Sequence, residues 1–301
     1  MNSVRVLSVF VLGSSLLAAL FFGGCGTARP VENSTAYRTA VKLNEEGERA
    51  WKSQEFRIAL SRYREAAEVF RAIEFSEGLA INLLNQAILM RQLGDRAGCG
   101  AALEEILGHP ELEFPEPLLA RAALYLARLR FEQGNIEAAA EAAARAVKWD
   151  RQSGRALDGE ISLVRARVAM RQDRPAEALP LLERARDVGN PRVEADSWRM
   201  YAALRAGQER WEDARTGYEE ALRRDKDLGR PRPIVRDLLA LGKVLARLGH
   251  PAEARNCFLR AASAARGSRD EAGQQEATAA AGRLAESAGS AATPSRVSGG
   301  D

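Results

Sequence analysis

The sequence predicts an all-α fold, a solenoid of about six helix-turn-helix repeats followed by a C-terminal capping helix. Three observations support this prediction. Apolar residues recur with the period of a helix through most of the chain, and no segment alternates apolar and polar residues as a strand does. One pattern of small and large side chains returns about every 40 residues, as in repeat proteins. Alanine, leucine, glutamate and arginine, all good helix formers, dominate the composition.

The repeat is clearest in residues 238–265. Leucines at helical spacing form one face of a first helix, and Gly249 and Pro251 then interrupt it as a turn does. A second helix follows. Gly242 and the alanines of the second helix allow a close approach of the two helices, while Phe258 and the leucines fill the space between them.

The same register extends upstream and defines six units. The second helix of each unit opens with a small residue, and these residues follow one another at spacings of about 36 to 40 positions: Ala59, Cys99, Ala139, Ala178, Ala214 and Ala254. The pattern resembles the tetratricopeptide repeat, in the variant with extended helices that is similar to kinesin light chains. The resemblance covers about residues 36–268. It implies a right-handed superhelix whose concave face is lined by the first helix of each unit.

Residues 1–24 are similar to the signal peptide of a bacterial lipoprotein. Arg5 precedes an apolar run that is short for a membrane span, and two glycines lead into Cys25. The resemblance implies that Cys25 is acylated and becomes the mature N-terminus, that residues 25–35 form a tether, and that the protein sits at the outer membrane facing the periplasm. A plain cleaved signal and a single N-terminal membrane anchor are the alternatives.

The C-terminal part of the sequence divides in two. Residues 269–288 have the polar, alanine-rich pattern of a helix that caps the open end of a solenoid. Residues 289–301 have no apolar period and are expected to be disordered. Cys99 and Cys257 fall at inward positions of distant units, so we expect two buried thiols and no disulfide between them.

Enzyme signals are weak, and we predict no catalytic residues, no metal site and no cofactor. His109 and His250 have no paired ligand spacing, and no glycine-rich loop follows a strand. The formal net charge is only +3, and aromatic residues are few. Nucleic-acid binding would need a basic stripe combined with stacking aromatic residues, and an exported chain would rarely meet nucleic acid, so such a partner is not expected.

The first helices carry a basic surface from the third unit onward. We predict that these residues contact a partner protein, because arginine binds carboxylates through paired, charge-assisted hydrogen bonds. The expected ligand is an acidic or C-terminal peptide segment. The alternative is that these cations pair with glutamates of neighbouring repeats and only solvate the surface. The predicted contact residues are Arg121, Arg128, Arg167, Arg171, Arg199, Arg236, Lys243 and Arg247.

Part of this surface resembles the carboxylate clamp of chaperone-binding tetratricopeptide domains. Asn44 and Asn85 occupy two amide positions of the clamp and Arg121 occupies a basic one. Glu48 and Tyr125 stand where asparagine and a basic residue are needed. The clamp is incomplete, so binding of a chaperone tail is not predicted.

The sequence as a whole therefore predicts a non-catalytic scaffold of the bacterial cell envelope, tethered to the membrane through Cys25. It does not choose among outer-membrane assembly, pilus, secretion and peptidoglycan machinery. A second hypothesis is a regulatory or sensor protein whose repeats bind a peptide or signalling partner. A third, remote hypothesis is an envelope hydrolase that uses scattered carboxylates.

Overall fold

The computed structural model describes residues 34–291, and every regular element in this range is a helix. Twelve of the helices form six antiparallel pairs, called units 1 to 6 below: α1 (Thr35–Lys52) and α2 (Phe56–Ala72), α3 (Ser76–Gln92) and α4 (Arg96–Gly108), α5 (Glu116–Glu132) and α6 (Ile136–Gln152), α7 (Asp158–Arg171) and α8 (Pro175–Arg186), α9 (Pro191–Gly207) and α10 (Trp211–Asp227), and α11 (Pro231–Arg247) and α12 (Pro251–Gly267). A 3-10 helix, η2 (Pro110–Leu112), follows unit 2, and α13 (Glu271–Ala291) follows unit 6.

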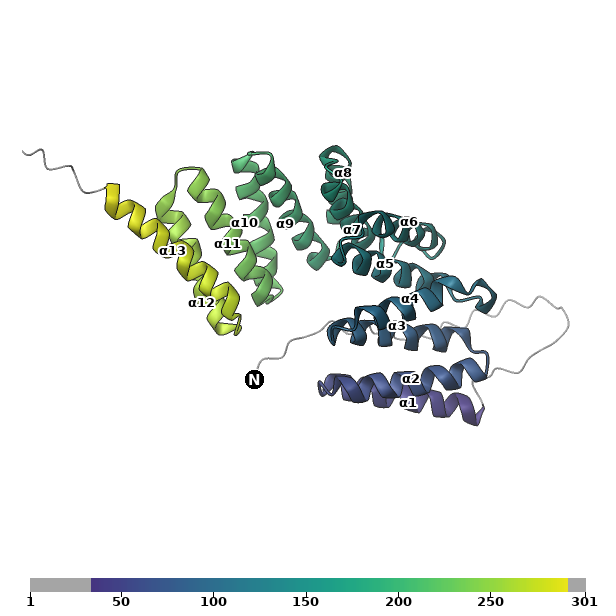
Figure 1. Ribbon diagram of the computed structural model, residues 1–301. Coiled ribbons are helices and arrows are strands. Elements are labelled where there is room, and N and C mark those ends of the chain that lie inside the picture. The colour runs from purple at the N-terminus through teal and green to yellow at the C-terminus, as the bar shows by residue number, and fades with distance from the viewer. Residues whose placement is uncertain (1–33, 292–301) are drawn as a thin grey trace, which may run out of the picture.

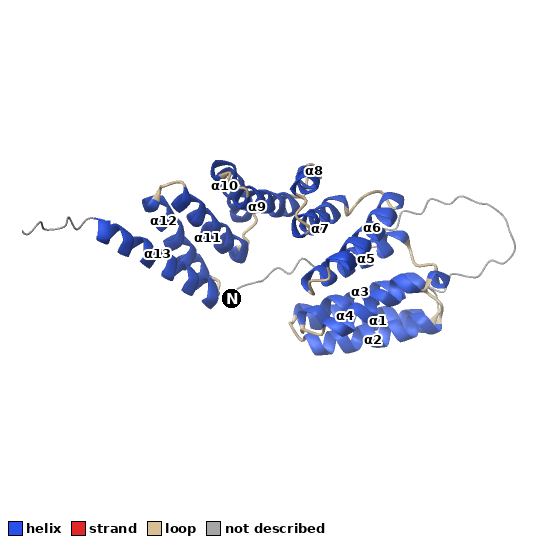
Figure 2. Ribbon diagram, turned by 45° about the horizontal axis from the view of Figure 1, so that its top comes forward, coloured by secondary structure: helices blue, strands red, loops and turns tan. Residues whose placement is uncertain are grey.

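The units stack side by side in a curved row that runs from α1 to α13 (Figures 1 and 2). The predicted all-α solenoid of helix-turn-helix repeats is confirmed. The last helix, α13, packs on α12 at the end of the row and continues past the expected cap, 269–288, to Ala291. Among residues 34–291, no helix has both the length and the apolarity that a membrane span requires.

Three predicted segments lie wholly or mainly outside the described residues. They are the signal peptide 1–24, the tether that begins with Cys25, and most of the tail 289–301. The assignments made for them remain predictions.

Most connections are three-residue turns of one kind. In nine of those described, the middle residue has a positive φ, and the amide of the third residue donates to the carbonyl five positions earlier at 2.8–2.9 Å. This bond satisfies a carbonyl that the helix end would leave open. Gly249 is one such middle residue (φ 81°), and Glu74, between units 1 and 2, is another (φ 53°). The same turn therefore serves both inside units and between them.

The small residues that define the register are buried in all six units, with at most 2% of their surface exposed. Twelve positions before them, on the first helix, every unit has glycine or alanine: Gly47, Ala87, Ala127, Ala166, Ala202 and Gly242. A Cβ added at Gly242 would lie 2.6 Å from Cε1 of Phe258, and one at Gly47 would lie 2.8 Å from Cε1 of Tyr63. In both end units an aromatic ring of the second helix therefore rests on the backbone of the first.

We expect Gly242→Val to lower the free energy of unfolding by about 1–3 kcal/mol, because the new side chain overlaps the ring of Phe258 and the helix pair must separate. Chemical denaturation monitored by circular dichroism measures this change. Gly207→Ala is the matched control, since an added Cβ there has nothing within 4 Å. Equal losses in the two variants would contradict the register assigned to the repeats.

Candidate interaction groove

The first helices of units 1 to 5 line a cavity of about 590 Å³, called the main groove below. Part of the basic surface predicted from the repeat register lies in this groove. Arg128 of α5 and Arg167 of α7, both predicted contact residues, line it, and so do Glu48 of α1 and Ile88 of α3, which hold the same position of the repeat. Arg121 lines it as well. Three of the eight predicted contact residues thus lie in one continuous surface.

Basic residues outnumber acidic ones along the main groove, by seven to three. Some of these charges are neutralised within the array. Arg128 of α5 pairs with Glu160 of α7 at 2.5 Å, and Arg91 of α3 pairs with Glu132 of α5 at 3.0 Å. For Arg128, therefore, the alternative expectation from the sequence, pairing with a glutamate of the neighbouring repeat, holds.

Three other cations of the main groove, Arg121, Arg167 and Arg192, form no ion pair with any residue of the described range 34–291. Arg167 is exposed, yet atoms of neighbouring helices surround it within the groove. This desolvation lowers the pKa of its guanidinium; the positive charges of Arg128 and Arg236 lower it further, while Asp196 acts in the opposite direction. The Nε of Arg121 is buried and has no hydrogen-bond partner. These three groups therefore bring positive charge to the groove that no ion pair with a described residue balances.

The positions that resemble a carboxylate clamp also lie in the main groove. Asn44, Glu48, Asn85, Arg121 and Tyr125 all line it. The Nδ2 of Asn44 lies 3.4 Å from Oε1 of Glu48 and donates to it. The amide of Asn44, which a ligand carboxylate would need as a donor, is therefore already bonded to Glu48. This agrees with the prediction of an incomplete clamp.

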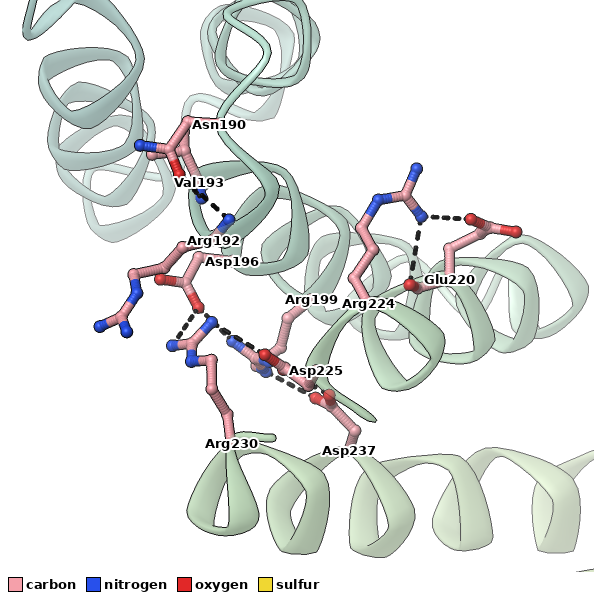
Figure 3. A network of polar contacts seen from close by, with 10 residues as sticks. All are labelled: Asn190, Arg192, Val193, Asp196, Arg199, Glu220, Arg224, Asp225, Arg230 and Asp237. Atoms are coloured by element: carbon pink, nitrogen blue, oxygen red, sulfur yellow. Dashed lines mark hydrogen bonds and ion pairs between the residues drawn. The ribbon is translucent and has the colours of Figure 1, made fainter. Parts of the chain in front are cut away.

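Arg199 does not present its charge to a ligand, although it was predicted to contact a partner. It lies in a cluster between units 5 and 6, with a side chain only 15% exposed (Figure 3). Its guanidinium donates to Asp196 at 2.6 Å, to Asp237 at 2.5 Å and to Asp225. Arg230, the residue before α11, donates to Asp225 at 2.8 Å and to Asp196 at 3.1 Å. The arginine thus joins three helices.

Two aspartates of this cluster, Asp225 and Asp237, are fully buried. Three carboxylates share two guanidinium groups, so one negative charge is left over. Burial raises the pKa of Asp237 to about 6, and the charge of Asp225 adds to the increase while Arg199 opposes it. Burial also lowers the pKa of Arg199, but its bonds to Asp237 and the nearby carboxylates outweigh this effect and raise it. Tyr218 faces the same group, and burial followed by the charge of Asp237 raises its pKa to about 12.

The remaining predicted contact residues separate into two groups. Arg236, Lys243 and Arg247 line a second cavity of about 400 Å³ on units 5 and 6. Arg171 is exposed on α7 and lines neither cavity. The basic surface expected as one row is therefore distributed over two cavities, with Arg171 in neither and Arg199 enclosed in the cluster.

Within the described part of the chain, no three His, Cys, Asp or Glu side chains come close enough to hold a metal ion. The Nδ1 atoms of His109 and His250 lie beside glutamates close in sequence, Glu111 at 2.7 Å and Glu253 at 3.3 Å. Cys99 and Cys257 are free and buried, as expected, and burial raises the pKa of both thiols.

The comparison with protein families concerns units 5 and 6. Residues 193–267, which span α9 to α12, match the family model described as tetratricopeptide repeat. This segment is therefore similar to tetratricopeptide repeats. No curated protein matches the sequence at a significant level.

Several solved structures have the same fold. A chain of the APC/C hetero-tetramer Cut9-Hcn1 is 13% identical with a TM-score of 0.64, over 82% of this chain and 43% of that one. The apo form of RapI is 12% identical with a TM-score of 0.62, over 83% and 72% of the two chains. A Rap protein complexed with Competence and Sporulation Factor is 17% identical with a TM-score of 0.56, over 85% and 73%. The chain thus spans less than half of the first of these proteins. At such low identities the similarity establishes the fold alone.

The cluster around Arg199 makes stability depend on pH in a defined direction. The folded protein holds a proton on Asp237 more tightly than the unfolded chain does. The stability gained from that proton is fully present below about pH 4, the ordinary range of an aspartate, and is lost as the pH rises through about 6.

We therefore expect the wild type to lose about 1–3 kcal/mol between pH 4 and 6 relative to Asp237→Asn, whose neutral amide imitates the protonated carboxyl. Denaturation of both proteins at several pH values measures this difference. Parallel pH profiles for the two proteins would show that Asp237 does not hold the proton.

Proposed function

We propose that the solenoid is a non-catalytic scaffold that binds an acidic or C-terminal segment of a partner protein in its main groove. Tetratricopeptide repeats generally bind other proteins or peptides and are not catalytic. The observation that carries the more specific proposal is the set of unpaired cations in the main groove, Arg121, Arg167 and Arg192.

The physical reason is the cost of leaving these charges uncompensated. A guanidinium that lines a groove and forms no ion pair lacks a carboxylate to balance its charge, as for Arg121 and Arg167. A carboxylate of a ligand would balance that charge through charge-assisted hydrogen bonds. Apolar side chains such as Ile81, Leu84 and Ile88 lie in the same groove and would cover the body of an extended peptide. A partner segment with several carboxylates therefore fits better than a neutral or basic one.

We further propose that the scaffold belongs to the bacterial cell envelope and is tethered through acylated Cys25, so that it binds its partners near the membrane surface. The support is the sequence of residues 1–25 alone. A regulatory or sensor protein with the same repeats is the second candidate. The two candidates differ in whether function requires attachment at Cys25.

The groove proposal predicts that Arg121→Glu together with Arg167→Glu weakens binding of an acidic peptide by about 100-fold or more, because each substitution removes a hydrogen bond to a charged group. Calorimetric titration with a synthetic peptide rich in glutamate measures this. The matched control is Arg64→Glu with Arg255→Glu, which makes the same charge change on exposed positions of second helices. Equal weakening in both proteins would reduce the effect to overall charge and would remove the groove from the proposal.

The envelope proposal predicts that the wild type, expressed with its native signal in a bacterium, incorporates labelled palmitate and fractionates with membranes. Cys25→Ala should do neither. A crosslinking pull-down should then capture an envelope partner with the wild type and lose it with the variant. If Cys25→Ala fractionates and binds like the wild type, the lipid anchor is wrong and the regulatory candidate takes precedence.

A further inference from the structure

The second cavity, of about 400 Å³, has a composition that the sequence did not predict. Its floor and walls are apolar: Ala206 of α9, Trp211 and Tyr218 of α10, and Leu239, Ala240 and Val244 of α11. Its rim is basic, with the exposed side chains of Arg236, Lys243 and Arg247. The capping helix α13 contributes Glu276 to the edge.

Two of the lining residues, Ala206 of unit 5 and Ala240 of unit 6, are smaller than the residues at the corresponding positions of the preceding units. In the repeat register, the position of Ala206 is held by Trp51, Arg91, Phe131 and Met170 in units 1 to 4. The position of Ala240 is held by Glu45, Asn85, Tyr125, Val164 and Met200 in units 1 to 5. The two alanines expose the apolar side chains around them, so the cavity has a volume and a lining suited to an apolar side chain of a ligand.

The charges at the rim indicate what flanks that side chain. Lys243 is paired with Glu276 at 2.8 Å, and the guanidinium of Arg247 lies 5.9 Å from the ring centre of Trp211. Arg236 has no ion pair with any described residue. Three cations thus face one carboxylate around an apolar depression, so carboxylates on either side of the inserted group would be attracted to the rim.

We propose that this cavity is a specificity pocket that takes a phenylalanine or a large aliphatic side chain flanked by acidic residues in the partner segment. The proposal rests on the binding of acidic segments proposed above and adds an apolar anchor to it. Burying such a side chain is worth about 1.5–3 kcal/mol, so the anchor should increase affinity by about 10- to 100-fold.

Two synthetic peptides test this proposal. One carries a phenylalanine and the other a serine between two pairs of acidic residues. The peptides are otherwise identical, so they have the same net charge. Calorimetric titration of the full solenoid should show the phenylalanine peptide binding at least about tenfold more tightly. Only the phenylalanine peptide should change the emission of Trp211, measured as the difference between the wild type and Trp211→Phe.

Filling the cavity provides the structural control. Ala240→Trp should abolish the advantage of the phenylalanine peptide and leave the serine peptide bound as before. Ala252→Trp, at an exposed position of α12 outside the cavity, should preserve the advantage. The fluorescence difference needs no cavity-filling variant, so it tests the pocket even if Ala240→Trp folds poorly.

The outcomes separate the two proposals. Equal affinities for the two peptides, or an unchanged advantage in a folded Ala240→Trp, would overturn the pocket and leave acidic-segment binding intact. If neither peptide binds, both proposals fail.

Discussion

The structure depends on one packing constraint, the close approach of the two helices inside each unit. A glycine or alanine on the first helix, as at Gly47 and Gly242, faces the side chain that stands four positions after the buried small residue of the second. Each unit packs mainly on its neighbours, so this contact must be made again in every repeat and cannot be replaced by a distant core. Everything on the concave face takes its direction from that contact, because it fixes the rotation of each first helix.

This constraint explains why the fold and the position of several groove residues could be predicted from the sequence. The period of a helix and the length of a repeat are local properties of a sequence, and together they placed Arg128, Arg167 and Lys243 on the concave side. The partners of these residues were not predictable in the same way. Glu160 reaches Arg128 from the next unit, 32 positions away, and Glu276 reaches Lys243 from the capping helix. Such pairs depend on how units stack, which no single repeat encodes.

The ion-pair partners of Arg199 were also not predictable from its position in the repeat. Its position in the repeat marked it as a surface cation, but Asp225 and Asp237, from two further helices, enclose it. Removing one partner of a buried ion pair generally destabilises a protein strongly, whereas the pair itself adds little to stability. The cluster therefore has a structural role, because its ion pairs link helices of units 5 and 6. The rest of the expected basic surface is distributed over a larger groove with unpaired arginines and a smaller pocket with an apolar floor.

The three-residue turn has a consequence for the history of such a chain. It connects helices within units and, after units 1 and 5, also connects one unit to the next. The backbone hydrogen bond is the same in each case, and the middle residue is glycine in some turns and another residue in others. A duplication or deletion that begins and ends at these turns rejoins the chain through a turn it already uses. Arrays built this way can change length by whole repeats without inventing a new linker, so copy number is an easily varied trait while the fit between neighbouring helices is not.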